Sequence, residues 1–96
     1  MPYVNPLIRN AVAPELASLV QGVRELPDTQ RDGALNYIIS ELVARSLRPD
    51  TGWNYFSIHR AHGVFQDAGA EFYRRVAGPY EAQCIVKHGD LQGYKL

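Results

Sequence analysis

The chain has 96 residues, of which 46% are apolar and 21% charged, and its ten basic and ten acidic side chains give a formal net charge of zero. This composition is that of an ordinary globular protein and argues against wholesale disorder. A chain without net charge lacks the long-range field on which non-specific binding to nucleic acid or to an anionic membrane depends. Nucleic acid is therefore not an expected partner, and any anion would have to be recognised locally.

The length predicts one domain, residues 1–96, with an N-terminal arm over 1–13 and a C-terminal tail over 91–96. No apolar run reaches the roughly 20 residues that cross a bilayer, and the first residues lack the apolar stretch of a secretory leader. A single cysteine, Cys84, excludes an internal disulfide and a zinc site built from several thiolates. We expect a cytoplasmic protein that uses no membrane and no cofactor.

Apolar residues recur at helical spacing in two segments of the first half. In the first, Pro14 and Glu15 suit a first helical turn and apolar side chains follow at intervals of three and four, which predicts a helix over 14–25. In the second, apolar side chains share one face over 32–47. The polar segment 28–33 is expected to connect the two helices and can already supply the first turn of the second.

The longest predicted helix runs from about Asn54 to Ala77. Its apolar seam repeats at spacings of three and four and consists of Tyr55, Ile58, His62, Phe65, Gly69, Phe72 and Val76. Glycine inside a helix costs about 1 kcal/mol relative to alanine, so Gly69 indicates the close approach of another backbone, in a tight helix crossing or a dimer contact. The Gly78-Pro79 step is expected to kink or end this helix and to open a short fourth one over 80–87, which Gly89 caps.

Several segments of the chain together resemble a known group of sequences. They are MPY at the start, DGALNYIISEL over 32–42, GVFQDAGAEFYRRVAGPYE over 63–81 and HGD over 88–90. In this combination the chain resembles a family of small, uncharacterised phage and bacterial proteins that carries the label of a domain of unknown function, and FYRRV-x-x-PYE is the specific part. The resemblance implies a compact helical protein that recurs in viral genomes. It implies no activity.

Two arginines between two tyrosines, Tyr73, Arg74, Arg75 and Tyr80, form the main candidate ligand-binding site. Guanidinium groups offer bidentate donors to phosphate or carboxylate, and the tyrosines could stack on a ring or donate their hydroxyls. An alternative explanation needs no ligand, because Glu71 precedes the two arginines by three and four residues and can pair with them on the helix surface. The sequence leaves both interpretations open.

Asn36 and Tyr37 form a second candidate ligand-binding site. They fall near the predicted start of the second helix, where unsatisfied backbone N–H groups and the positive end of the helix dipole attract anions. The competing explanation is that Asn36 caps the helix locally and Tyr37 packs. If both candidate sites faced one cleft, that cleft would suit a nucleotide-sized anion.

Other reactive side chains have simpler explanations. His59 and His62 lack the third ligand that zinc needs, and His62 lies on the apolar seam, where a core or interface histidine is expected. Cys84 lies among apolar residues, which favours a small buried hydrophobe over a nucleophile. Enzymatic function is therefore the least supported class.

The sequence predicts an all-α fold of three principal helices plus a short C-terminal helix, with the long third helix as its spine. For function it favours a non-enzymatic, homo-oligomeric binding protein for an anionic small ligand, such as a phage protein that sequesters a host signalling nucleotide. The alternative is a protein-interaction or structural module of phage or bacterial origin that has no small-molecule ligand.

Overall fold

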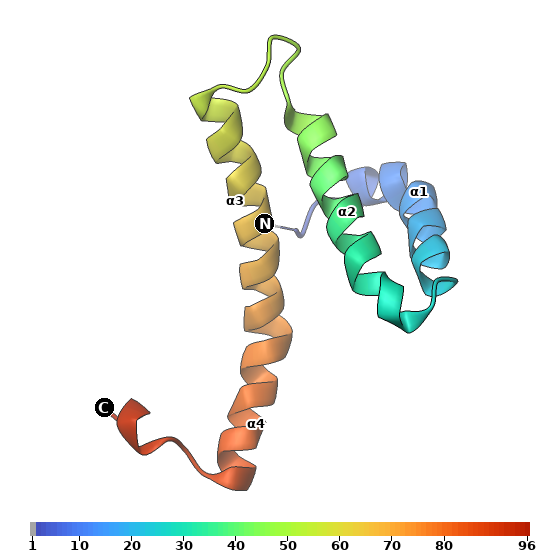
Figure 1. Cartoon of the computed structure of the whole chain (residues 1–96). Helices are drawn as coiled ribbons and strands as arrows, with labels where there is room; N and C mark the ends of the chain where they lie inside the picture. The colour runs from blue at the N-terminus through green and yellow to red at the C-terminus, as the bar shows by residue number, and fades with distance from the viewer. Residues whose placement is uncertain (1) are drawn as a thin grey trace. The chain divides into compact units, whose positions relative to one another are not determined.

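The computed structural model describes residues 2–96, and all regular structure within them is helical. The four α-helices are α1 over Pro6–Arg24, α2 over Asp28–Leu47, α3 over Tyr55–Phe72 and α4 over Gly78–His88 (Figure 1). A π-helical turn, η1, covers Tyr73–Ala77 and joins α3 to α4, and a 3₁₀ turn, η2, covers Gln92–Tyr94. The predicted all-α fold, with a long third helix and a short helix after it, is confirmed.

Contacts divide the chain into two units, whose boundary falls inside α3. One is Tyr3–Val64 and the other consists in the main of Phe65–Leu96. The first unit holds α1, α2 and the beginning of α3, and the second holds the rest of α3, η1, α4 and η2. That the whole length forms one domain stays a prediction.

The first helix begins at Pro6, well before the predicted start at Pro14, so most of the predicted N-terminal arm is helical. Asn5 caps it, because its side-chain Oδ1 accepts a hydrogen bond from the backbone N–H of Ile8 at 3.1 Å. Pro6 then takes the first helical position, where a missing N–H costs nothing. The prediction was wrong because it took Pro14, which lies inside α1, as the start instead of the Asn-Pro pair before it.

Arg31 fixes the junction between α1 and α2. The second helix begins at Asp28, so the predicted connector 28–33 is its first turn and a half rather than a loop. The Arg31 guanidinium reaches back over this turn and donates to the carbonyl of Leu26 at 3.2 Å and to that of Arg24 at 2.9 Å. Carbonyls at a helix C-terminus have no partner inside the helix, so Arg31 satisfies the open carbonyl of Arg24 at the end of α1, together with that of Leu26 in the turn that follows.

Asn54 and Ser57 cap the start of α3 reciprocally. The backbone N–H of Ser57 donates to Asn54 Oδ1 at 2.9 Å, and the backbone N–H of Asn54 donates to Ser57 Oγ at 3.0 Å. This is the arrangement of a capping box, with serine in the place where glutamate is commoner. The pair sets the start of the long helix close to the predicted position.

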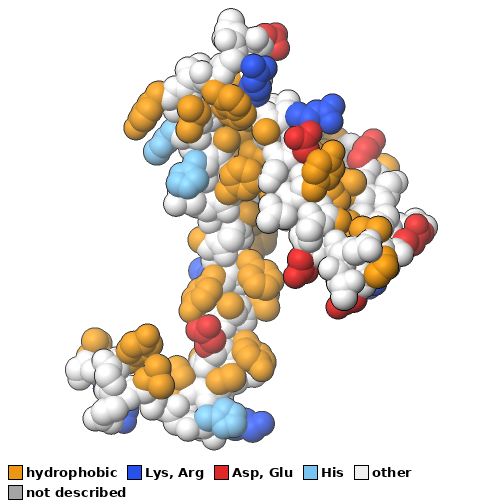
Figure 2. Space-filling view, viewed as in Figure 1, with side chains coloured by type: hydrophobic (Ala, Val, Ile, Leu, Met, Phe, Trp, Pro, Cys, Tyr) orange, Lys and Arg blue, Asp and Glu red, His pale blue; other side chains and the backbone are white. Residues whose placement is uncertain are grey.

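Little of the described chain is buried. Over residues 2–96 the buried side chains are Ser57 and Ala61. The seam that was expected to form the core is exposed, from 40% for Phe65 to 84% for Tyr55, and Figure 2 shows apolar side chains spread over the surface. Apart from its chain neighbours and the nearby backbone of its own helix, no heavy atom lies within 4 Å of the place where a Cβ on Gly69 would stand, so the close approach predicted there is not made within the unit that holds Gly69.

Candidate functional site around the π-helical turn

Gly78 and Pro79 were predicted to kink or end the long helix and to open a short fourth one. The fourth helix, α4, does begin at Gly78, but a π-helical turn accommodates the proline, so the helical path is not interrupted there. Pro79 has no N–H to donate, and its ring would clash with the carbonyl four residues before it in a regular α-helix. In η1 the backbone N–H of Gly78 instead donates to the carbonyl of Tyr73, five residues back. The wider turn accommodates the ring and the helix continues to His88. Figure 1 shows α3 and α4 as one continuous helical ribbon.

The π-turn leaves little room for a side chain at residue 78. A Cβ added to Gly78 would lie 3.2 Å from the carbonyl oxygen of Tyr73, which is closer than an ordinary van der Waals contact. That oxygen belongs to the backbone and already accepts the hydrogen bond of the turn. The glycine therefore follows from close packing of its own helix, and its φ of −60° is ordinary.

Tyr73 and Glu81 meet across the π-turn. The Tyr73 hydroxyl donates to Glu81 Oε2 at 2.7 Å. This hydrogen bond raises the pKa of Tyr73 above its ordinary value of 10.0, and the negative charge of Glu81 and some loss of solvent act in the same direction. Residues seven apart share a face of a regular α-helix. The turn adds one residue, so this contact joins residues eight apart.

The surface ion pair that the sequence offered as an alternative to ligand binding is present at Arg74. Its guanidinium makes two hydrogen bonds to the Glu71 carboxylate, at 2.6 and 3.3 Å. The Arg74 side chain is 66% exposed and that of Glu71 is 22% exposed. Arg75 is not without an interaction either. The paired arginines are thus already held in part by their own chain.

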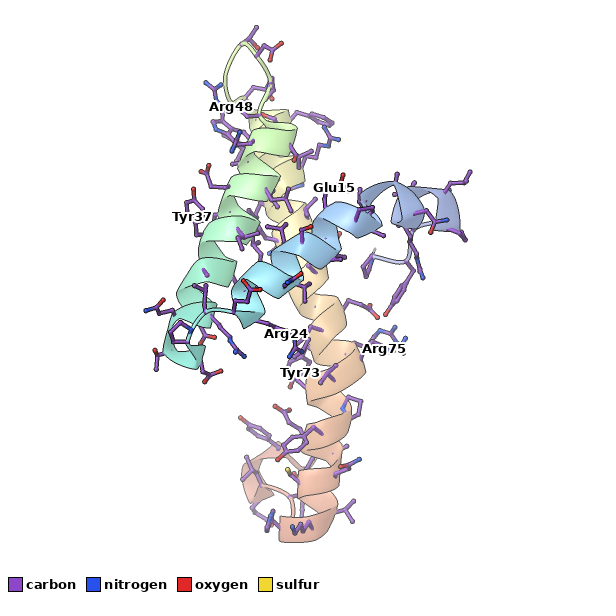
Figure 3. The ribbon with its side chains drawn as sticks, turned by 90° about the vertical axis from the view of Figure 1, so that its right-hand side faces the viewer. Glu15, Arg24, Tyr37, Arg48, Tyr73 and Arg75 are labelled. Atoms are coloured by element: carbon purple, nitrogen blue, oxygen red, sulfur yellow. The ribbon has the colours of Figure 1, made fainter. Side chains whose placement is uncertain are left out.

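The candidate side chains of η1 point in different directions. Figure 3 shows Tyr73 and Arg75 leaving the helix on opposite sides, as expected for residues two apart in a helix. Tyr80, on α4, is 67% exposed. The wall of two arginines and two tyrosines predicted from the sequence is therefore divided between two sides of one helix.

Asn36 and Tyr37 do not lie at a helix start. Since α2 begins at Asp28, they lie about two turns inside it, where backbone N–H groups are already bonded. Asn36 Oδ1 accepts a hydrogen bond from Ser40 at 3.4 Å, and Tyr37 is 68% exposed. Their rationale as an anion site at a helix terminus is wrong. They also belong to the unit Tyr3–Val64, whereas the arginine pair belongs to the other unit.

An apolar groove between α1 and α2 was not predicted. Its volume is about 420 Å³, and we call it the α1–α2 groove. It is lined by Leu16, Leu19, Val20, Val23, Arg24, Arg31, Leu35, Ile38, Ile39 and Leu42. The sequence contained its signal, because both helices carry an apolar stripe, but the periodicity does not show how much of each stripe the other helix covers.

The remaining candidate features are metal ligands, the reactive side chains His62 and Cys84, and membrane-spanning helices. Over residues 2–96, no three histidine, cysteine, aspartate or glutamate side chains gather as the ligands of a metal ion would. His62 is exposed, so the core position expected for it is wrong and the interface position stays a prediction; Cys84 is half-buried. None of the helices in this part of the chain has the length and apolar content needed to cross a membrane.

Comparison with known proteins identifies the family. The comparison with curated proteins and the comparison with solved structures give no match. The sequence model of one family, described as domain of unknown function DUF6899, matches residues 1–91. Because the match covers nearly the whole chain and includes the π-turn and its tyrosines and arginines, the chain belongs to the DUF6899 family.

Proposed function

We propose that the chain is a non-enzymatic protein-interaction module whose apolar helical faces pack against a protein surface outside the chain. One observation carries this proposal. Over residues 2–96 only Ser57 and Ala61 are buried, while large aliphatic side chains on every α-helix are exposed by 40% or more. A helix of this length owes most of its stability to packing of its apolar face rather than to intrinsic propensity.

The free energy that burial of these side chains would contribute supports the same proposal. Fully burying one large aliphatic side chain stabilises a protein by about 1.5 to 3 kcal/mol. Leu16, Leu42 and Ile58 are each between 54% and 57% exposed, so each could still contribute on the order of 1 kcal/mol on being covered. The net stability of a domain is only about 5 to 15 kcal/mol, so several such side chains make a partner surface significant for folding.

Dye binding and unfolding of the dilute chain test this proposal. At a concentration where sedimentation shows a monomer, we expect the helical chain to bind a hydrophobic dye strongly and to unfold over a broad temperature range. We expect dye binding to fall when a partner surface covers the helices. A monomer that binds no dye and unfolds in one sharp transition would show that the chain covers its own apolar faces, and would refute the proposal.

A second candidate function is the binding of an anionic small ligand, such as a host signalling nucleotide sequestered by a homo-oligomeric phage protein in the cytoplasm. The position of the arginines favours it, because π-turns occur frequently at functional sites. Arg74 and Tyr80 are 66% and 67% exposed, so a phosphate could reach the guanidinium and a ring could stack on the tyrosine. Glu71 competes with the anion for Arg74.

A thermal-shift screen with nucleotides and cyclic dinucleotides tests the second candidate. A ligand at 100 times its dissociation constant stabilises the folded state by about 2.7 kcal/mol, which for a domain of this size raises the melting temperature by roughly 10 °C or more. The variant Arg74→Gln should lose this shift, and the exposed Arg60→Gln on α3 should keep it. The absence of a shift with every nucleotide, or an equal shift in both variants, would exclude this candidate.

A further inference from the structure

One apolar stripe runs along the second unit, from α3 through η1 into α4, and we call it the α3–α4 stripe. Its larger side chains are between 40% exposed, at Phe65, and 67% exposed, at Tyr80. Tyr73 and Arg75, which leave the helix on opposite sides in Figure 3, flank the stripe. The stripe consists of Phe65, Gly69, Phe72, Val76, Tyr80 and Cys84.

The π-turn keeps this stripe on one face of the helix. Steps of three and four residues in alternation follow one face of an α-helix and are the spacing of a coiled coil. Beyond η1 that spacing would reach Pro79, but η1 holds one residue more than an α-helical turn, so Tyr80 takes the place and Cys84 follows four residues later. The contact of Tyr73 with Glu81, eight residues apart instead of seven, shows the same shift. The stripe is therefore spaced for packing against another helix.

Large and small side chains alternate along the α3–α4 stripe. Phe65, Phe72 and Tyr80 are aromatic, and a smaller residue follows each of them. If a second such helix packs alongside in the opposite direction, its order of side chains is reversed, so the large side chains of each helix meet the small ones of the other. About a two-fold axis close to η1 the facing pairs are Phe65 with Cys84, Gly69 with Tyr80, and Phe72 with Val76.

We propose that a second copy of the chain covers the α3–α4 stripe, with the two helices antiparallel about this two-fold axis. The proposal rests on the protein-interaction function proposed above and names its partner and its surface. In a two-fold interface the same patch serves on both sides, so the patch has to be complementary to itself. The alternation of large and small side chains gives the stripe this property, and this selects a second copy as the partner. It also gives Gly69 a role, because the Tyr80 ring of the second copy then packs against open backbone.

A parallel pair of the same helices fits less well. Each side chain would then face its own equivalent, so Gly69 would face Gly69 across a void while Phe72 crowded Phe72. The parallel pair would bring Arg75 toward Glu81 of the other copy, whereas the antiparallel pair brings the two Arg75 side chains together beside the axis. Arg75 is exposed and already has an interaction, and charge pairs at exposed positions contribute little. Packing of the aromatic rings therefore decides the direction.

The exposed area is enough for a stable interface. An aromatic side chain buries about 150 to 250 Å² when it is fully covered. At their observed exposures the four aromatic side chains and one valine, namely Phe65, Phe72, Tyr73, Tyr80 and Val76, offer about 500 Å² of apolar surface per copy. Homodimer interfaces are about 65% apolar, which gives about 750 Å² in all per copy. Stable interfaces bury about 600 to 1,000 Å² per partner, so the stripe suffices for a dimer.

Sedimentation of the full chain over a range of concentrations tests the proposal. Gly69→Leu fills the space that the Tyr80 ring of the second copy occupies and should weaken dimerisation at least tenfold. In the dilute monomer position 69 is open, and leucine favours a helix over glycine, so this variant keeps its fold. Ala70→Leu, at the neighbouring exposed position outside the stripe, is the matched control and should leave dimerisation unchanged. Circular dichroism shows whether each variant stays helical.

A second substitution tests which residues face each other. Tyr80→Ala alone should weaken dimerisation, but in the Gly69→Leu background it makes room for the leucine of the other copy and should restore dimerisation at least tenfold. Tyr37→Ala, at an exposed position on α2, should restore nothing in the same background. If Tyr80→Ala does not restore dimerisation, the proposed pairing of Gly69 with Tyr80 is refuted.

Cys84, the single cysteine, reports the direction of the two helices. Antiparallel packing separates Cys84 from Cys84 of the second copy by roughly 27 Å along the helix axis. Mild oxidation of the wild-type dimer should therefore give no disulfide-linked dimer, whereas Phe65→Cys, opposite Cys84, should give one. A wild type that cross-links, or a Phe65→Cys dimer that does not, would overturn the antiparallel arrangement.

A wild-type chain that stays monomeric at millimolar concentration would overturn the proposal as a whole. The dye-binding test above then decides separately whether the apolar faces are covered by a different protein.

Discussion

The hydroxyl of Tyr73 donates to the carboxylate of Glu81 at 2.7 Å, although the two residues are eight positions apart on one helix. The contact exists because the π-turn between them adds one residue to the two turns that separate a regular pair. It therefore reports directly on whether the turn is formed in solution.

Titration of Tyr73 should show this contact. We expect its ionisation midpoint to lie above 10, because the hydrogen bond to Glu81 and the charge of that carboxylate disfavour the phenolate. Glu81→Gln should return the midpoint toward 10, and Tyr80→Phe should not move it. Tyrosine ¹³Cζ chemical shifts resolve the individual residues. A Tyr73 midpoint at or below 10 in the wild type would mean that the two side chains do not meet.

The raised pKa of Tyr73 also determines how the stability of the folded state changes with pH. The folded-state pKa of Tyr73 is raised above its unfolded value, so the stabilisation from this contact is fully present below about pH 10. It is lost as the pH rises through the folded-state pKa. Unfolding in urea should therefore show a smaller difference between wild type and Tyr73→Phe at high pH than at pH 8.

A pair of glycine substitutions tests the π-turn sterically. Gly69→Ala should raise the free energy of unfolding by about 1 kcal/mol, because alanine favours a helix and the added methyl meets no atom within 4 Å. Gly78→Ala should gain none of this, since its Cβ would lie 3.2 Å from the Tyr73 carbonyl oxygen. Urea unfolding followed by circular dichroism measures both. A loss at Gly69 would instead indicate that another copy packs against it.

Much of the fold followed from hydrophobic periodicity, and the errors have physical causes. The periodicity of the second and third helices placed both close to their observed spans. It could not show whether the stripe through Phe65 and Phe72 is covered, because an amphipathic helix has the same pattern whether its cover comes from its own chain or from a partner. The start of the first helix was predicted at Pro14 instead of Pro6 because the capping side chain of Asn5 was not taken into account.

The candidate site was predicted less well than the fold. The pairing of Glu71 with Arg74 follows from helical spacing, and it was among the alternatives. The meeting of Tyr73 with Glu81 could not be derived, because it depends on a π-turn for which the sequence offers only a Gly-Pro step. Asn36 and Tyr37 were misplaced by their dependence on a helix start that lies at Asp28.

Arg31 should contribute to the stability of the α1–α2 hairpin. Its guanidinium donates to the carbonyls of Arg24 and Leu26, and removing it leaves both without this donor. We expect Arg31→Met to lower the free energy of unfolding by about 1 kcal/mol. Arg45→Met, at an exposed position on the same helix, is the control and should have less than half that effect. Thermal unfolding compares the two variants, and equal losses would mean that the carbonyl contacts add nothing.

Substitutions in the capping box at the start of α3 should destabilise the protein more than a substitution inside a helix. Asn54→Ala and Ser57→Ala should each cost about 1 kcal/mol, since each removes an acceptor for a backbone N–H at the helix start. Ser57 is only 3% exposed, so water cannot easily replace its hydroxyl. Asn36→Ala, inside α2, should cost nothing. Free energies from urea unfolding check this, and the double variant should cost less than the sum of the single ones.

The wide turn at Tyr73–Ala77 also changes how homologous sequences have to be aligned. Turns of this kind hold one residue more than the α-helical path they replace, so the helix behaves as though a single codon had been inserted between its two halves. Deleting Ala77 would remove that extra residue and rotate everything downstream by about 100° around the helix axis. A family member that lacks one residue here would present its C-terminal segment at a different angle around the helix axis, and residues matching Gly78 and Pro79 would no longer have a π-turn to fit.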